Sequence, residues 1–150
     1  MSANFNRIIL SLILSFICLR TSYATEAGRT ARVCINKDTC VIAQIADTDQ
    51  LRIKGLMFKK AMTDSEAMLF IFPEEGRYSF WMMNMRIALD IIWIDRALRI
   101  VDMRTNLAPC ADGPCESVLP GSNAHYVLEV PAGFTLRHHI TIGNTVSINN

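Results

Sequence analysis

The sequence predicts a mainly β (α+β) domain: a small antiparallel β-barrel or folded-over sheet of seven to eight strands, with one or two short helices. Three observations indicate this fold class. The apolar runs are short and rich in β-branched and aromatic residues. Clusters of Pro, Gly, Asn and Asp separate these runs, as expected for turns. Only two segments have residues typical of a helix start, so helices are few.

The N-terminus has the features of an export signal rather than of a folded element. Arg7 supplies a positive charge, an apolar stretch follows from Ile8 to Leu19, and Ser22-Tyr23-Ala24 matches a cleavage site after Ala24. A membrane-spanning helix needs about 20 apolar residues, so an uncleaved anchor is the less favoured alternative. The expected organisation is a signal peptide at 1–24, a flexible leader at 25–30 and a single domain at 31–150 that is periplasmic or secreted.

The charge balance of the exported part argues against two classes of partner. Loss of Arg7 and Arg20 with the signal leaves 13 of the 15 basic side chains against all 14 acidic ones. A chain this close to neutral lacks the excess of positive charge that attracts nucleic acid or an anionic membrane. We therefore expect no nucleic-acid partner, and no membrane contact after signal removal.

Four cysteines remain after the signal, at Cys34, Cys40, Cys110 and Cys115. Their two close spacings favour local disulfides, Cys34–Cys40 and Cys110–Cys115, in an oxidising compartment. Each bond closes a short loop and should stabilise the fold by about 2 kcal/mol. The alternative is a four-thiolate zinc site, but cysteine pairs in such sites usually have tighter spacing than these.

The first elements are predicted from turn and cap residues. The β-rich runs 31–35 and 39–46 flank Asn36-Lys37-Asp38 and indicate a hairpin, with Cys34 and Cys40 facing each other. Asp47 and Gln50 match a helix N-cap and its reciprocal partner. Gly55 suits the position after a helix that ends at Lys54.

Two further hairpins are expected in the centre. The run 67–72 stops at Pro73 and pairs with 77–82, while 89–94 pairs with 97–105 around Asp95-Arg96. After them, the Pro-, Gly- and Ser-rich segment 106–123 is predicted to be a long loop pinned by the second disulfide. The final elements are a strand at 125–130, one or two helical turns at 131–139 that begin with Pro131, and a strand at 141–148.

Several of these segments occur in the same order in a known family. They are GLMF (55–58), MLFIFP (68–73), YSFWMMN (78–84), LDIIWID (89–95), the loop from Pro109-Cys110 to Cys115, YVLEV (126–130) and AGF (132–134). In these motifs the chain resembles the domain-of-unknown-function 192 family, also named uncharacterised protein family 0127, over residues 39 to 148. The resemblance implies a compact, largely β domain that bacteria often export, and it implies no established activity. Family members often have Lys or another residue in place of Met83 and Thr in place of Met85.

Aromatic and methionine side chains gather in the centre of the chain, at Met57, Phe58, Phe80, Trp81 and Met82, with the amide of Asn84 among them. Such side chains most often pack in a core. They also form the walls of pockets for small, partly apolar ligands or sugar rings. The predicted ligand-binding residues are Met57, Trp81, Asn84, Asp90 and Glu129.

Asp90 and Glu129 interrupt apolar strand segments, where an unpaired charge is costly. Each could face solvent or pair with an arginine such as Arg77 or Arg86. If the two acids converge, they form a carboxylate pair suited to a hydrolase or to binding a hard metal ion. Acids on opposite faces of the sheet would dismiss that reading.

Copper binding is a further alternative, because Met82, Met83 and Met85 cluster and soft thioethers favour Cu(I). His125, His138 and His139 could add nitrogen ligands, although they are distant in sequence. The favoured prediction is an exported soluble binding or envelope-accessory domain with no cofactor and no resident metal, and a hydrolase that uses Asp90 and Glu129 is the alternative. Its expected partner is a small polar or sugar-like ligand or an envelope protein.

Overall fold

The computed structural model describes residues 28–110 and 114–149. The predicted signal peptide and the first half of the predicted leader, residues 25–27, lie outside these residues. Within them, no helix has the length and apolar composition needed to cross a bilayer.

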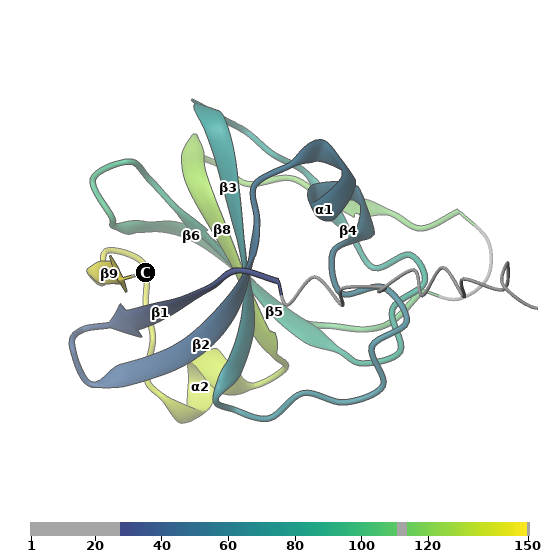
Figure 1. Cartoon of the computed structure of the whole chain (residues 1–150), viewed down its shortest axis with the longest axis horizontal. Coiled ribbons are helices and arrows are strands. Elements are labelled where there is room, and N and C mark those ends of the chain that lie inside the picture. The colour runs from purple at the N-terminus through teal and green to yellow at the C-terminus, as the bar shows by residue number, and fades with distance from the viewer. Residues whose placement is uncertain (1–27, 111–113, 150) are drawn as a thin grey trace, which may run out of the picture.

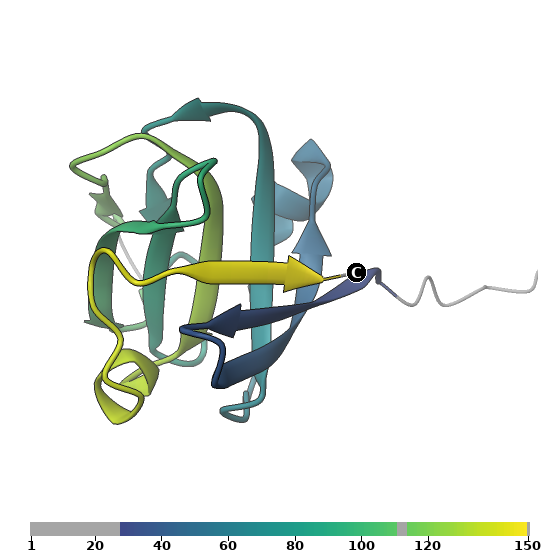
Figure 2. The same cartoon turned by 90° about the vertical axis from the view of Figure 1, so that its left-hand side faces the viewer.

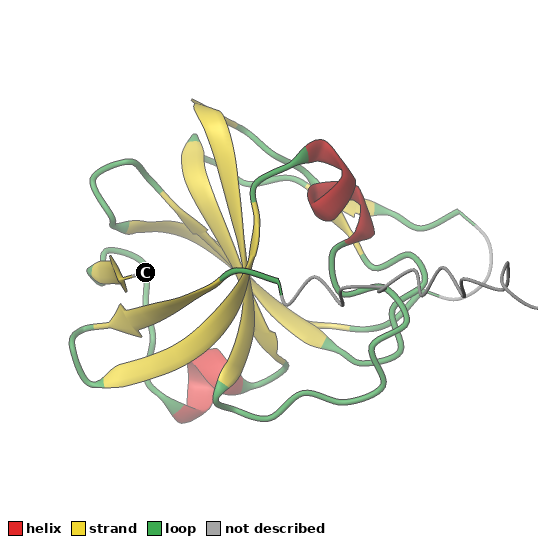
Figure 3. Cartoon of the chain, viewed as in Figure 1, coloured by secondary structure: helices red, strands yellow, loops and turns green. Residues whose placement is uncertain are grey.

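The chain is mainly β, as predicted, with two short helices (Figure 3). Its elements are β1 (Thr30–Ile35), β2 (Thr39–Ala46), α1 (Asp49–Lys54), β3 (Glu66–Gly76), β4 (Phe80–Trp81), β5 (Leu89–Ile94), β6 (Ile100–Leu107), β7 (Ser117–Val118), β8 (Ala124–Pro131), α2 (Phe134–Arg137) and β9 (Val146–Asn149).

Seven strands form one curled sheet in the order β6-β5-β8-β3-β2-β1-β9, and β4 pairs with β7 in a separate two-stranded sheet. Pairing is antiparallel except between β2 and β3, which run parallel. A parallel pair needs a crossover connection, and the one between these strands contains α1. The two ends of the sheet approach each other, since Arg99 and Thr145 form a bridge between the β5–β6 turn and the segment before β9. Figures 1 and 2 show the resulting half-barrel.

Two apolar cores lie on opposite faces of this sheet. The inner core fills the barrel and includes Leu69, Ile92, Leu128 and Phe134. The outer core lies against β3, β5 and β8, beneath the connections that precede and follow β4, and includes Trp93. Because apolar groups cover both faces, all six residues of β5 are buried.

Two predicted hairpins are confirmed and one is wrong. The strands β1 and β2 pair as expected, as do β5 and β6. In contrast, β3 pairs with β2 and β8, and its predicted partner segment contains β4, which pairs with β7. Pro73 does not stop β3, because regular pairing with β8 ends at Ile71 and the missing N–H of Pro73 interrupts no ladder there.

The helix boundaries also differ from expectation. Thr48 rather than Asp47 is the N-cap of α1, and its hydroxyl accepts a hydrogen bond from the Leu51 amide. Asp47 forms an ion pair with Arg29 instead. The predicted end of α1 at Gly55 is confirmed, since Gly55 has a φ of 48°.

The C-terminal elements are shorter than predicted. Pro131 ends β8 instead of starting a helix, and α2 begins after Gly133. The last strand occupies only 146–149, because the Asn144 side chain accepts from the Thr141 amide and closes a turn before it.

Candidate functional site

A pocket of about 540 Å³ opens between α1 and β4, beside the outer core. Figure 1 shows these two elements next to each other, to the right of β3 and β8. Aromatic rings and methionines dominate its lining. The rings are Phe70, Phe72, Tyr78, Phe80 and Trp81, the methionines are Met57, Met83 and Met85, and the charged side chains are Asp49, Arg52, Lys54, Arg77 and Glu129.

Strand alternation places Glu129 at the bottom of this pocket. In β8 its neighbours Leu128 and Val130 belong to the inner core, so the Glu129 side chain points to the outer face. Its partners on the adjacent strands are Met68 on β3 and Ile91 on β5, both in the outer core. Glu129 is therefore a single carboxyl group between apolar strand neighbours.

The Glu129 carboxyl group is buried and incompletely hydrogen-bonded. Its residue is 5% exposed, and its Oε2 atom has no hydrogen-bond partner among the described residues. Burial raises the pKa of Glu129 to about 8, because a charged carboxylate is poorly solvated there. At neutral pH the group is mostly a neutral carboxylic acid.

Stacked and edge-on rings hold the pocket wall in position. Phe72 and Tyr78 stack with their centroids 3.5 Å apart, and Phe80 packs edge-on against Phe70 at 4.9 Å. The Trp93 indole donates to the Tyr78 carbonyl at 2.9 Å, so the outer core is tied to the wall. Trp81 is 46% exposed and lies at the mouth.

The arginines of the lining already have polar partners. Arg52 donates to the Ile71 carbonyl and to Asp49, and its guanidinium lies over the Phe72 ring. Arg77 donates through Nε to the Pro120 carbonyl at 2.7 Å. Neither is a counter-ion of Glu129, and Arg86, the other expected counter-ion, lies over the Phe58 ring.

Three of the five predicted ligand-binding residues, Met57, Trp81 and Glu129, line this pocket. Asn84 is not one of the lining residues. Its Nδ2 lies 3.8 Å from the Met57 Sδ, and its carbonyl accepts a hydrogen bond from the Phe58 amide. Asn84 therefore positions Met57.

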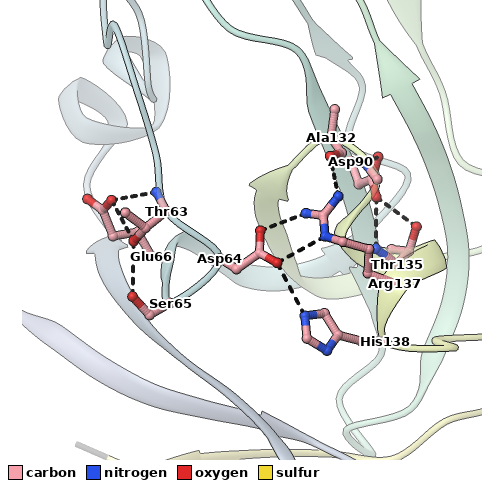
Figure 4. Close-up of polar contacts among 10 residues, drawn as sticks. Thr63, Asp64, Ser65, Glu66, Asp90, Ala132, Thr135, Arg137 and His138 are labelled. Carbon is pink, nitrogen blue, oxygen red and sulfur yellow. Dashed lines mark hydrogen bonds and ion pairs between the residues drawn. The ribbon is translucent and has the colours of Figure 1, made fainter.

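The structure separates Asp90 from the pocket. Asp90 pairs with Val130, an inner-core residue, and so points to the opposite face from Glu129. Its carboxylate accepts from the amides of Asn106, Gly133 and Thr135 and from the Thr135 hydroxyl. Figure 4 shows its contact with Thr135. Asp90 therefore ties β5 to the end of β6 and to α2, and the predicted carboxylate pair is not formed.

Beside Asp90 lies a surface network that the sequence reasoning missed (Figure 4). Asp64 accepts two hydrogen bonds from Arg137 and lies 3.5 Å from the His138 Nε2. The hydrogen bond from Arg137 lowers the pKa of Asp64. This network joins the segment before β3 to α2. Asp64 and Arg137 are 73 residues apart in the sequence, so no local pattern could reveal their contact.

Glu66 forms a second network at the start of β3, and this one joins residues that are close in the sequence. It accepts from Lys59 and from the amide and hydroxyl of Thr63, as Figure 4 shows for Thr63. The hydrogen bond from Lys59 is the main cause that lowers the pKa of Glu66 to about 2. Asp64 and Glu66 both have hydrogen-bond partners in the protein, so their role is to hold the segment before β3 in position.

The residues of the copper alternative are dispersed. Met82 is buried in the outer core, while Met83 and Met85 line the pocket. His138 contacts Phe134 of the inner core, and no histidine is among the described lining residues. In residues 28–110 and 114–149, no three His, Cys, Asp or Glu side chains are grouped to hold a metal ion.

The cysteines pair locally, as predicted. The sulfur atoms are 2.13 Å apart in Cys34–Cys40 and 2.09 Å apart in Cys110–Cys115. Cys110 also exchanges backbone hydrogen bonds with the pocket wall, donating to the Met82 carbonyl and accepting from the Asn84 amide. The second disulfide therefore helps to hold the backbone of Met82 and Asn84, next to the pocket wall, in position.

A family model supports the resemblance seen in the sequence. The model of DUF192, described as "Uncharacterized ACR", matches residues 31–148. A UPF0127 protein of Thermococcus kodakarensis is 30% identical over 106 residues, which are 69% of this chain and 62% of that protein. One from Pyrococcus horikoshii is 34% identical over 95 residues, 60% of this chain and 72% of that protein.

A third UPF0127 relative, from Thermococcus gammatolerans, is 32% identical and matches 69% of this chain and 64% of its own length. The chain thus spans less than two thirds of the two Thermococcus proteins.

Two crystal structures have the same fold. One is a candidate transcription regulator from Sinorhizobium meliloti 1021, with a TM-score of 0.74 at 24% identity, over 81% of this chain and 95% of that one. The other is a protein of unknown function from Novosphingobium aromaticivorans, with a TM-score of 0.73 at 25% identity, over 83% of this chain and 89% of that one.

Proposed function

The chain belongs to the DUF192 family, and from its pocket we propose that it is a binding domain for a small organic molecule. The ligand has an apolar body and one hydrogen-bonding group. The body contacts the aromatic and methionine walls, including Met57 and Trp81, and the polar group reaches Glu129.

The unpaired Oε2 of Glu129 is the observation that supports this proposal most strongly. A buried polar atom without a partner costs about 1–3 kcal/mol. A ligand that supplies the missing hydrogen bond recovers that free energy. The volume of about 540 Å³ also lies in the usual range for small-molecule pockets.

The binding proposal is tested by a ligand-observed NMR screen of small aromatic and aliphatic compounds that differ in their polar group. Hits should bind the wild type and lose affinity in Trp81→Ala, because that variant removes a wall of the pocket. Ile142→Ala is the matched control, since Ile142 is also exposed and apolar but does not line the pocket. Hits that bind Trp81→Ala and the wild type equally would contradict the proposal.

We further propose that the domain works in an oxidising compartment, as a periplasmic or secreted binding or envelope-accessory protein. The two cysteine pairs at bonding distance support this location, because such bonds persist mainly outside the reducing cytosol. Intact-mass analysis of the protein from its native envelope should give a chain that starts at Thr25 and has two disulfides. A cytosolic chain that retains residues 1–24 and has five free thiols would exclude this location.

A further inference from the structure

We propose that the ligand of this pocket is an organic cation: a protonated amine on an aromatic or aliphatic body, whose nitrogen donates to Glu129. The inference rests on the proposed function and adds the chemical class of the ligand. Its basis is the arrangement of the pocket floor and of the rings around it.

The floor offers an acceptor whose missing donor the protein does not supply. The buried residues of the described lining are Leu56, Phe70, Met85 and Glu129. Of these, Glu129 alone is ionisable. Since Met68 and Ile91 flank it in the sheet, no side chain on either neighbouring strand position donates to Oε2. The donor must therefore enter through the pocket.

The walls favour a cation over a neutral or anionic group. The face of an aromatic ring attracts positive charge, and the Arg52 guanidinium already uses this attraction 5.4 Å from the Phe72 centroid. Phe80, Tyr78 and Trp81 add further rings to the lining. An ammonium group at the floor forms an ion pair with the Glu129 carboxylate and is also attracted to the faces of the rings. A hydroxyl group gains only a hydrogen bond. A carboxylate can accept the proton of neutral Glu129, but the negative ring faces repel it.

The other titratable and charged groups of the lining do not reverse this preference. They are Asp49, Arg52, Lys54, Arg77 and Tyr78. Arg52 is paired with Asp49, while Lys54 and Arg77 are exposed at the rim, where water and salt screen their charge. Burial raises the pKa of Glu129, and none of these cations donates a hydrogen bond to its Oε2.

Binding of an ammonium group to Glu129 requires that the carboxylic acid first lose its proton. The Glu129 carboxylic acid loses its proton to solvent, and the resulting carboxylate pairs with the ammonium group, which keeps all its protons. With a pKa of about 8, about one Glu129 in ten is ionised at pH 7, so binding releases about 0.9 proton. Affinity must therefore rise with pH until Glu129 is ionised.

The test is isothermal titration calorimetry of the purified protein with three compounds of similar size: 2-phenylethylamine, 2-phenylethanol and phenylacetate. We expect the amine to bind most tightly at pH 7. Its affinity should rise about tenfold from pH 6 to 7 and about fivefold from pH 7 to 8, following the ionised fraction of Glu129. Titrations in buffers of different ionisation enthalpy should report the proton released.

Two variants assign the effect to Glu129. Glu129→Gln keeps the shape but cannot ionise, so the proton release, the pH dependence and the preference for the amine should all disappear. Glu116→Gln is the matched control: Glu116 is exposed and does not line the pocket, so all three should persist. The comparison of the three compounds on the wild type stands even if Glu129→Gln does not fold.

Two outcomes overturn the inference and differ in what else they reject. If 2-phenylethanol or phenylacetate binds as tightly as the amine, or amine binding releases no proton, the ligand class is wrong and the proposed binding function stands. If none of the three binds and the compound screen also finds no Trp81-dependent ligand, both proposals fail.

Discussion

A buried glutamate without a full set of hydrogen bonds costs a protein free energy at any pH where an exposed glutamate is ionised, and Glu129 is such a residue. Asp90 is equally buried, yet four hydrogen bonds satisfy it. At the scale of single residues, these two acids have opposite roles. Asp90 stabilises the fold, whereas Glu129 weakens it and, in the proposed function, is the group that a ligand contacts.

Glu129 should make the stability of the protein fall with rising pH. Its pKa is raised from 4.5 to about 8 on folding, so between these values the unfolded chain is ionised while the folded one keeps its proton. The stabilising contribution is complete below the unfolded pKa and is lost as pH rises to the folded pKa, by about 1.4 kcal/mol per pH unit.

Urea unfolding of wild type and Glu129→Gln at pH 5, 6.5 and 8 measures this loss. The free energy of unfolding of the variant should increase relative to the wild type at each step. The other acids contribute equally to both proteins, so their effects cancel. Parallel pH profiles of the two proteins would show that Glu129 titrates normally.

Asp90→Asn should destabilise the fold by about 2–4 kcal/mol, since an amide keeps one acceptor oxygen and turns an NH₂ group toward backbone donors. The exposed Asp38→Asn is the control and should be nearly neutral. Chemical denaturation measures both. The ligand affinity of the folded Asp90→Asn protein should be unchanged. A selective loss of binding with no loss of stability would show that Asp90 takes part in ligand binding.

At the scale of elements, the pocket wall depends on contacts that join distant parts of the chain. The strand β4 has two residues and pairs with β7, while the Cys110 backbone forms hydrogen bonds with the backbone of Met82 and Asn84. The opposite wall is α1 and the turn at Gly55, which local cap and glycine signals predict well. One wall is thus encoded locally and the other by tertiary structure.

The two disulfides should have different effects on binding. Replacement of Cys110 and Cys115 by alanine should lower ligand affinity several-fold, because this bond anchors the wall, and should destabilise the fold by about 2 kcal/mol. The Cys34→Ala/Cys40→Ala variant is the matched control: it should lose similar stability and keep its affinity, since β1 and β2 do not line the pocket. Calorimetry and thermal unfolding separate the two effects. Equal affinity losses would show that the bonds act only through global stability.

At the scale of the whole molecule, the protein is a half-barrel with one core inside and a second core on its outer face. The pocket lies beside the outer core, in the outer layer. The strands β5 and β8 have hydrogen-bonded neighbours on both sides. In contrast, β4 is a two-residue strand in a two-stranded sheet, and isolated backbone hydrogen bonds hold the residues that follow it. The outer layer is therefore the part that can adjust to a ligand without opening the barrel.

Hydrogen exchange should reveal this difference. Amides of residues 77–88 should exchange faster than those of β5 and β8, because fewer of them are in a ladder. A bound ligand should slow exchange in 77–88 most strongly. Uniform protection across the wall and the barrel would contradict a separate outer layer.

The sequence predicts the fold class and the contents of the pocket better than it predicts how they are arranged. Turn residues between short β-rich runs identify the local hairpins, but the β3–β8 and β4–β7 pairings bring together residues far apart in the chain. Asp90 and Glu129 have nearly identical apolar surroundings in sequence. Both faces of β5 and β8 are covered, so burial alone cannot assign a side, and only the register of Asp90 with Val130 and of Ile91 with Glu129 separates them.

The free-state titration of the Glu129 side chain, followed by the ¹³C shift of its carboxyl carbon, examines the pocket floor without any assumption about the ligand. A midpoint near pH 8 is expected if the group is buried and lacks a partner. A midpoint near the ordinary glutamate value of about 4.3 would mean that water or a protein donor already satisfies it, and the pocket would lose the feature on which its function depends.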